Sequence, residues 1–262
     1  MTSYQKILFT LDQGIARITL NRPEKRNALD AELISEIRDA MRSCTRDETV
    51  RVIVITGAGS DFCSGADLSG LEKTFNAGVL ENMADARNMA ELFVEMRHHP
   101  RPIVAVVRGR ALAGGCGLAT ACDLIVANES AKFGYPEVNI GFVPAMVMAI
   151  LRRSLSEKRA FELIASGETI TAQTAADFDL INAVFADETF DIDAEAFISK
   201  LAAKSASAIT LSKRLLYHMD GMTYEAALEA GVETNAIARM TDDMKRGVEK
   251  FLNQARKTEP HA

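Results

Sequence analysis

Apolar and polar residues alternate in two short runs near the start of the chain, residues 6–11 and 15–20. Alternation with a period of two is typical of β-strands that bury one face. The residues between the two runs, 12–14, end in a glycine, which suits the tight turn of a hairpin. The pattern therefore predicts an antiparallel, half-buried hairpin.

The apolar pattern changes along the rest of the chain. Residues 50–56 and 103–107 are nearly continuous apolar runs, which favour strands covered on both faces. Helical spacing follows Asp30, a typical helix N-cap, and dominates after position 188. The late helices are predicted over residues 190–203, 206–218, 223–239 and 242–255. We therefore expect an α/β core over residues 1–190 and a C-terminal helical region over residues 191–262.

Composition narrows the class of partner. The 262 residues carry a net charge of -6, the pI is near 5.4 and 48% of the residues are hydrophobic. This acidity argues against a nucleic-acid-binding protein, although a small ligand could still be anionic. The sequence has no run of about 18 apolar residues and no signal-peptide pattern. We therefore expect no membrane span and a cytoplasmic protein.

Cysteine and histidine offer little for a metal or thiol-based site. The four cysteines lack CxxC spacing, so we interpret them as reduced packing residues. His98 and His99 are adjacent and cannot share one helix face, so we expect no metal site and interpret the pair as the end of a helix. Neither Gly-x-Ser-x-Gly nor HExxH occurs. Carboxylates and backbone amides are left as the candidate chemistry.

Gly114, Gly115 and Gly117 follow the apolar run 103–107 at a predicted helix start. Glycine disfavours a helix interior by roughly 0.8–1 kcal/mol relative to alanine, so these positions need another reason. The first helix amides, which lack intrahelical acceptors, could bind a negative or polarised oxygen. Alternatively, the small residues let the helix pack tightly against a sheet. The pattern alone fits both explanations.

Two further positions are candidates for the same chemistry. Ala66 lies in a Gly-Ala-Asp turn that could expose its backbone amide, and the glycines before it complete neither GxGxxG nor a phosphate-binding P-loop. Glu137 is a lone acid among apolar and small residues. It is either a catalytic base or an ordinary surface carboxylate.

Three cations, Arg22, Lys25 and Arg26, follow the predicted hairpin in a loop that contains a proline. Solvated loop charge is the default interpretation of such residues, and a phosphate contact is the alternative.

Residues 62–68 and 104–124, with the continuation 133–137, resemble the crotonase (enoyl-CoA hydratase/isomerase) superfamily in residue type and spacing. The similarity extends to residues 20–23 and 140–144 and covers nearly the whole chain. It implies an α/β fold built as a crotonase-type spiral of ββα turns, which contribute to two roughly perpendicular sheets. It also implies that the C-terminal helices build a homotrimer or a dimer of trimers.

The resemblance further implies a substrate and a site. The substrate would be an acyl-CoA thioester, with coenzyme A as part of the substrate and no separate cofactor. The amides of Ala66 and Gly114 would form an oxyanion hole, and Glu137 would be the catalytic base. The residues expected to bind the CoA portion are Arg22, Lys25, Ala28, Asp67 and Leu68.

The chain departs from the hydratases of that family at one position. Those enzymes carry a second glutamate where this sequence has Gly117. Water addition must activate water and deliver a proton, whereas moving a double bond needs one base that removes and returns a proton. We therefore expect an enoyl-CoA isomerase. A hydratase is the alternative if another acid, such as Glu72 or Asp67, enters the site, and a non-catalytic acyl-CoA-binding protein is a third hypothesis.

The expected acyl site also departs from those hydratases. Residues 145–148, Ala-Met-Val-Met, stand where hydratases commonly have a glycine-rich run. Larger side chains there should reshape the acyl pocket, which the resemblance places along residues 71–80 and 142–148.

Overall fold

The computed structural model describes residues 4–67, 70 and 76–258, and the side chains up to residue 253. A six-stranded main sheet has the order β1-β2-β3-β4-β6-β9, and a three-stranded second sheet has the order β5-β7-β8. The main strands are β1 (Ile7–Asp12), β2 (Ile15–Leu20), β3 (Val52–Gly57), β4 (Ile103–Val107), β6 (Leu124–Asn128) and β9 (Ala183–Phe185). The second sheet contains β5 (Arg110–Leu112), β7 (Lys132–Gly134) and β8 (Thr169–Thr171). The expected α/β fold with two sheets is confirmed.

Strands β1 and β2 form the predicted antiparallel hairpin, with Asp12 opposite Ile15. The two residues between them, Gln13 and Gly14, have φ angles of 48° and 79°. Positive φ at both central residues is the geometry of the type I′ turn that suits the twist of a hairpin. From β2 onward, each neighbouring pair in the main sheet is parallel.

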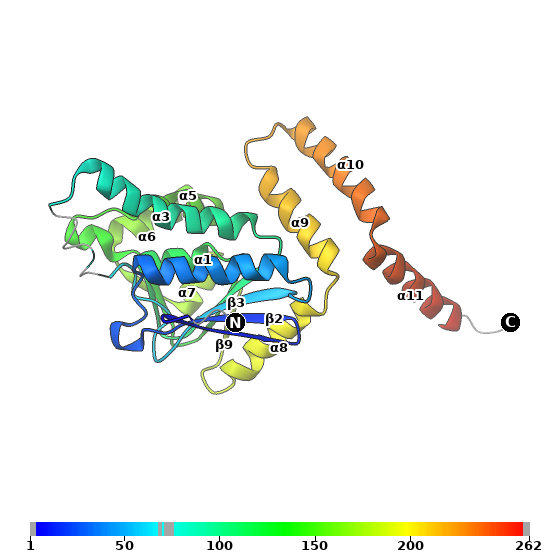
Figure 1. Cartoon of the computed structure of the whole chain (residues 1–262), viewed down its shortest axis with the longest axis horizontal. Helices are drawn as coiled ribbons and strands as arrows, with labels where there is room; N and C mark the ends of the chain where they lie inside the picture. The colour runs from blue at the N-terminus through cyan, green and yellow to red at the C-terminus, as the bar shows by residue number, and fades with distance from the viewer. Residues whose placement is uncertain (1–3, 68–69, 71–75, 259–262) are drawn as a thin grey trace.

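Strand β3 shows why the main sheet needs apolar residues on both faces. Ile53 and Ile55 belong to the large core cluster, whereas Val52 and Val54 belong to a second cluster on the opposite face. Helices α1 (Ala31–Arg46) and α3 (Val79–His98) cover the first face, and α8 (Phe190–Ala202) covers the second (Figure 1). The prediction of a doubly covered strand is confirmed.

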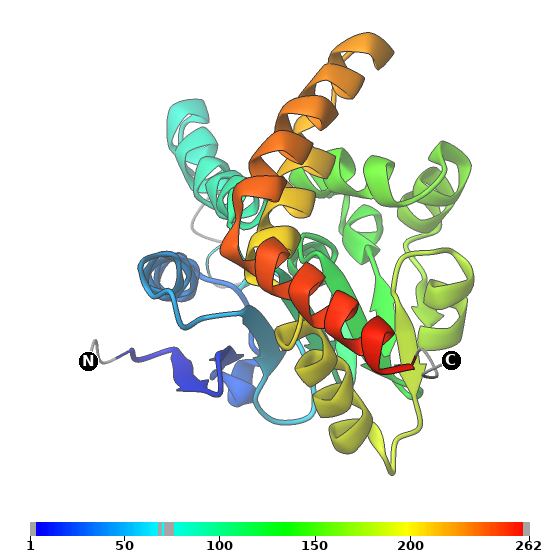
Figure 2. The same cartoon turned by 90° about the vertical axis from the view of Figure 1, so that its right-hand side faces the viewer.

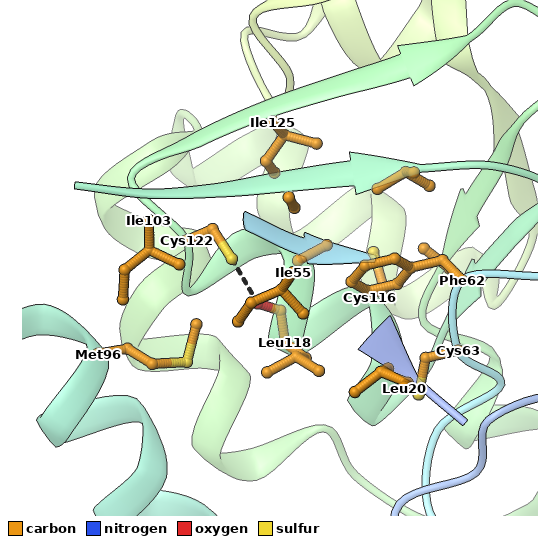
Figure 3. Packing of buried hydrophobic residues seen from close by; sticks show 14 of the residues in the cluster. Leu20, Ile55, Phe62, Cys63, Met96, Ile103, Cys116, Leu118, Cys122 and Ile125 are labelled. Carbon is orange, nitrogen blue, oxygen red and sulfur yellow. Dashed lines mark hydrogen bonds between the residues drawn. The ribbon is translucent and has the colours of Figure 1, made fainter. Parts of the chain in front are cut away.

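Figure 3 shows the large cluster at the point where β3, β4 and β6 meet the short helix α4 (Gly114–Thr120). Ile55, Ile103 and Ile125 from the three strands pack around Leu118 of α4. All four cysteines are buried and free, which agrees with their interpretation as packing residues. Helix α4 is therefore held deep in the core rather than at the surface.

The remaining helices before the C-terminal region are α5 (Ala145–Ser154), α6 (Glu157–Ser166) and α7 (Ala172–Asp177), and two 3-10 turns are η1 (Pro23–Lys25) and η2 (Pro136–Ile140). Asp30 caps α1, because its side chain accepts a hydrogen bond from the Leu33 amide at 2.8 Å. Helix α3 ends at His98, as predicted. The His99 ring is buried against the carbonyl of Met41 and the Thr45 hydroxyl, and this burial lowers its pKa.

Helices α9 (Ala206–His218), α10 (Tyr224–Met240) and α11 (Asp242–Thr258) form an arm that α9 anchors to the core through the 2.7 Å Lys213–Asp123 ion pair and that α10 and α11 extend away from the two sheets (Figures 1 and 2). This arm carries exposed large apolar side chains, including Leu216, Tyr224, Leu228, Val232, Ile237, Met240 and Phe251. Within the described residues, none of the helices combines the length and the apolar character needed to cross a membrane.

Candidate active site

Two backbone amides, those of Ala66 and Gly114, lie side by side where the second sheet meets α4. A Cβ atom built on Gly114 would lie 3.7 Å from the Ala66 nitrogen, and one built on Gly65 would lie 3.2 Å from the Gly114 nitrogen. Neither amide donates a hydrogen bond to any residue in the described ranges. Two adjacent N–H groups without an acceptor can hold one oxygen atom between them.

The Ala66 amide is turned toward α4 by a short parallel bridge. Leu29 donates its amide to the Gly65 carbonyl at 2.7 Å and accepts the Asp67 amide at 2.9 Å. Because the directions of neighbouring peptide groups alternate in an extended chain, the intervening Ala66 N–H points away from Leu29. The predicted exposure of this amide is thus built by the loop that follows β2.

The Gly114 amide is turned outward by an unusual backbone at Ala113. This residue has φ 50° and ψ -130°, a region that costs a residue other than glycine about 1–3 kcal/mol. Its own amide donates to the Gly134 carbonyl at 2.8 Å, which fixes the peptide in place. The strain is located one residue before the candidate oxyanion donor.

The glycines of α4 serve different purposes. A Cβ built on Gly114 would make only ordinary van der Waals contacts, since the nearest atoms are 3.7 Å away. A Cβ on Gly115 would instead lie 2.3 Å from the Cys63 carbonyl oxygen, so this glycine is required for packing. The packing explanation of the glycine run is confirmed for Gly115, and the role of the Gly114 amide as an oxyanion donor stays a prediction.

Glu137 lies at the start of η2, and its carboxyl group is buried. Its Oε2 atom has no hydrogen-bond partner among the described residues. Burial raises the pKa of the carboxyl group, and the hydrogen bond from its own backbone amide opposes this only in part. The side chain is therefore not an ordinary surface carboxylate.

The segment that carries Glu137 is held against α4. The Tyr135 and Thr120 hydroxyl groups form a 2.9 Å hydrogen bond, and Gly134 accepts the Ala113 amide. The negative charge of Glu137 also contributes to the raised pKa of the Cys116 thiol, although burial is the main cause there. Glu137 and the two amides thus belong to elements that are packed together.

The surroundings of Gly117, three residues after Gly114 in α4, are apolar. A Cβ built on Gly117 would lie 2.5 Å from Val147 Cγ2 and 3.5 Å from Phe93 Cζ. Val147 belongs to α5 and Phe93 to α3, and both are buried. The position at which the family's hydratases carry a second glutamate therefore faces hydrocarbon.

The expectation of solvated charge is wrong for Arg22. Its guanidinium is buried, donates to the Ala28 carbonyl, and forms ion pairs with Asp67 at 2.8 Å and Asp30 at 3.0 Å. Lys25 is half exposed and reaches the same Asp67 carboxylate at 3.3 Å. These contacts tie the loop that follows β2 to the turn containing Ala66.

The predicted binding roles of Arg22, Lys25, Ala28 and Asp67 stay predictions. Ala28 is buried beside Arg22, and Leu68 and Glu72 lie outside the described residues. Two contacts carry no signal in the sequence, the Arg22–Asp67 ion pair and the Tyr135–Thr120 hydrogen bond, because they join residues 45 and 15 positions apart. Periodicity gives no signal for such pairs.

Comparisons with known proteins agree with this architecture. A family model described as "Enoyl-CoA hydratase/isomerase" matches residues 10–259. A Thermus thermophilus protein named provisionally as an enoyl-CoA hydratase is 37% identical over 92% of this chain and 95% of its own length. The 2,3-dehydroadipyl-CoA hydratase of Escherichia coli is 32% identical over 95% of this chain and 96% of its own length.

A solved structure gives the same result. The enoyl-CoA hydratase structure from Mycobacterium smegmatis matches with a TM-score of 0.91 and 31% identity, and the match covers 95% of this chain and 97% of that chain. The expected crotonase fold is confirmed by this likeness. The chain belongs to the enoyl-CoA hydratase/isomerase family of the crotonase superfamily.

Proposed function

We propose that this protein is an acyl-CoA enzyme that works through a thioester enolate and moves the double bond of an enoyl-CoA. The observation that carries the proposal is one buried carboxyl group, Glu137, on a segment that packs against α4, together with two adjacent amides, those of Ala66 and Gly114, that have no acceptor among the described residues. The acyl-CoA substrate class is supported by the names of the relatives.

In this proposal, the thioester oxygen accepts hydrogen bonds from both amides. Removing a proton from C2 of a 3-enoyl-CoA moves negative charge onto that oxygen, where fixed N–H donors stabilise it by several kcal/mol. The proton is taken by the Glu137 carboxylate. The resulting carboxylic acid returns it at C4, which leaves the double bond between C2 and C3 and regenerates the base.

The environment of Glu137 suits this exchange of roles. A carboxylate in water is a weak base, and burial raises its pKa toward the range in which it can both take and return a proton. None of the described residues forms a hydrogen bond with its Oε2 atom, so a substrate carbon could approach that oxygen.

Hydration is the second candidate, and the names of the relatives favour it. It requires a group that handles water in addition to Glu137. Gly117 offers no side chain, and Asp67 accepts hydrogen bonds from Arg22 and Lys25, which is the arrangement of an ionised acceptor rather than a proton donor. These contacts favour isomerisation.

We further propose that CoA binds beside Lys25, Ala28 and Asp67, because the Lys25 side chain is more exposed than that of Arg22, which shares the same Asp67 carboxylate. The exposed apolar face of α9, α10 and α11 supports assembly into a homotrimer or a dimer of trimers, since a monomer would leave these side chains in water.

Product analysis tests the proposal. The protein is incubated separately with a 2-enoyl-CoA and a 3-enoyl-CoA, and the products are examined by mass spectrometry after chromatography. Isomerisation predicts a new species of unchanged mass from either substrate. A product heavier by one water from the 2-enoyl-CoA, with no isomer, would establish hydration instead. Tight binding of both substrates without any product would favour the non-catalytic alternative.

A further inference from the structure

We infer that Val147 is a specificity-determining residue, which keeps water and a second acid out of the α4 side of the active site. This inference rests on the proposed function of Glu137 as the single base. It concerns the contact between Gly117 and Val147, which joins two elements 30 positions apart in the sequence.

The geometry of the contact leaves no room for a side chain at position 117. A Cβ atom there would lie 2.5 Å from Val147 Cγ2, and real Cβ atoms do not approach other heavy atoms so closely. Val147 cannot swing aside easily, because a β-branched side chain in a helix has one strongly preferred rotamer. It is also buried, with 4% of its surface exposed.

The chemistry of the surroundings points the same way. The atoms nearest to the built Cβ are Val147 Cγ2, Phe93 Cζ and Val147 Cβ, all of which are carbon. A held water molecule needs two to four polar partners, and an ionised acid is costly to bury without them. The described atoms nearest to this position therefore offer water no hydrogen-bond partner that would hold it for attack on the substrate.

Glycine at 117 and valine at 147 consequently act as a pair. A carboxylate side chain at position 117 fits only if Val147 is replaced by a smaller residue at the same time. We therefore expect the single variant to lose stability and the double variant to fold and to add water. A residue that only packs would change the stability of the fold, whereas a residue that determines specificity also changes which product is formed.

The test compares Gly117→Glu, Val147→Ala and the double variant Gly117→Glu/Val147→Ala with the unchanged protein. Each is melted to assess folding and then incubated with a 2-enoyl-CoA, and the ratio of hydrated to isomerised product is measured. Val126→Ala combined with Gly117→Glu is the matched control, because Val126 is equally apolar and buried but belongs to the cluster on the other face of the main sheet.

We expect Gly117→Glu alone to melt well below the unchanged protein, by about 5 °C or more. Adding Val147→Ala should recover much of that loss and raise the ratio of hydrated to isomerised product at least about tenfold, while adding Val126→Ala should do neither. A Gly117→Glu variant that folds and hydrates as well as the double variant would overturn the inference. So would a stable double variant whose product ratio is unchanged.

The unchanged protein separates this inference from the proposed function. If it adds water rather than isomerising, the single-base proposal fails whatever the variants do. If it isomerises and the double variant gains no hydration, the role of Val147 fails while the proposed function stands.

Discussion

Two positions of α4, Gly114 and Gly117, have very different surroundings. The Gly114 amide lies beside that of Ala66, and neither donates a hydrogen bond to any described residue. Gly117, three residues later, is packed against Val147 and Phe93. One short helix thus carries a polar position that can stabilise a developing negative charge and an apolar position whose nearest described neighbours are carbon atoms. The reaction proposed for this protein depends on keeping that difference.

Substitutions at the glycines of α4 should give the largest effects on stability. Gly115→Ala should destabilise the protein by about 3 kcal/mol or more, because its Cβ would meet the Cys63 backbone, which cannot move without shifting the sheet. Chemical unfolding measures this loss.

Gly114→Ala is the matched control for that substitution. Its Cβ would find ordinary contacts at 3.7 Å, so the free energy of unfolding should change by less than about 1 kcal/mol. Equal losses of unfolding free energy in the two variants would mean that Gly114 and Gly115 are packed equally closely.

The turn that places the Ala66 amide beside Gly114 also depends on the buried guanidinium of Arg22, which forms an ion pair with Asp67. Arg22→Ala should cost about 2 kcal/mol of unfolding free energy, which is less than the roughly 3–5 kcal/mol for a fully buried ion pair, because Lys25 and Lys6 still accompany Asp67 and Asp30. Arg26→Ala, a change at an exposed residue of the same loop, is the control.

The kinetics of Arg22→Lys decide how this residue acts. If Arg22 orients the turn that carries the Ala66 amide, the substitution should lower kcat. If Arg22 binds a CoA phosphate, as the sequence predicts, KM should rise while kcat holds.

The pH dependence of stability gives a smaller effect. The pKa of Glu137 in the folded protein is raised above its ordinary value of 4.5, so the folded state binds this proton more tightly than the unfolded state. The resulting contribution to stability is present below pH 4.5 and is lost as the pH rises through the raised pKa. Glu137→Gln should therefore gain stability relative to the unchanged protein between acidic and neutral pH. If the difference in unfolding free energy between the two proteins did not change with pH across that range, the raised pKa of Glu137 would be contradicted.

Much of the fold was predictable because its signals are local. The hairpin followed from alternation before Gly14, the doubly covered β3 from its apolar run, and the start of α1 from Asp30. The family resemblance supplied the two-sheet architecture, which periodicity does not reveal.

The site was predictable only in part. The glycine-rich segment pointed to α4. Which of its glycines are closely packed depends on Cys63, beside Gly115, and on Val147, beside Gly117, and both are distant in sequence. The burial of Arg22 was missed for the same reason, since a loop cation is exposed unless a carboxylate from elsewhere, here Asp67, comes to meet it.

The most direct test of the central claim is the turnover of a 3-enoyl-CoA by the Glu137→Gln variant, with Glu129→Gln as an exposed control. If one carboxylate both removes and returns the proton, kcat/KM for isomerisation of the 3-enoyl-CoA should fall by about 10²–10⁴-fold in Glu137→Gln and stay unchanged in Glu129→Gln. Isomer formation at the original rate by a folded Glu137→Gln protein would contradict the account.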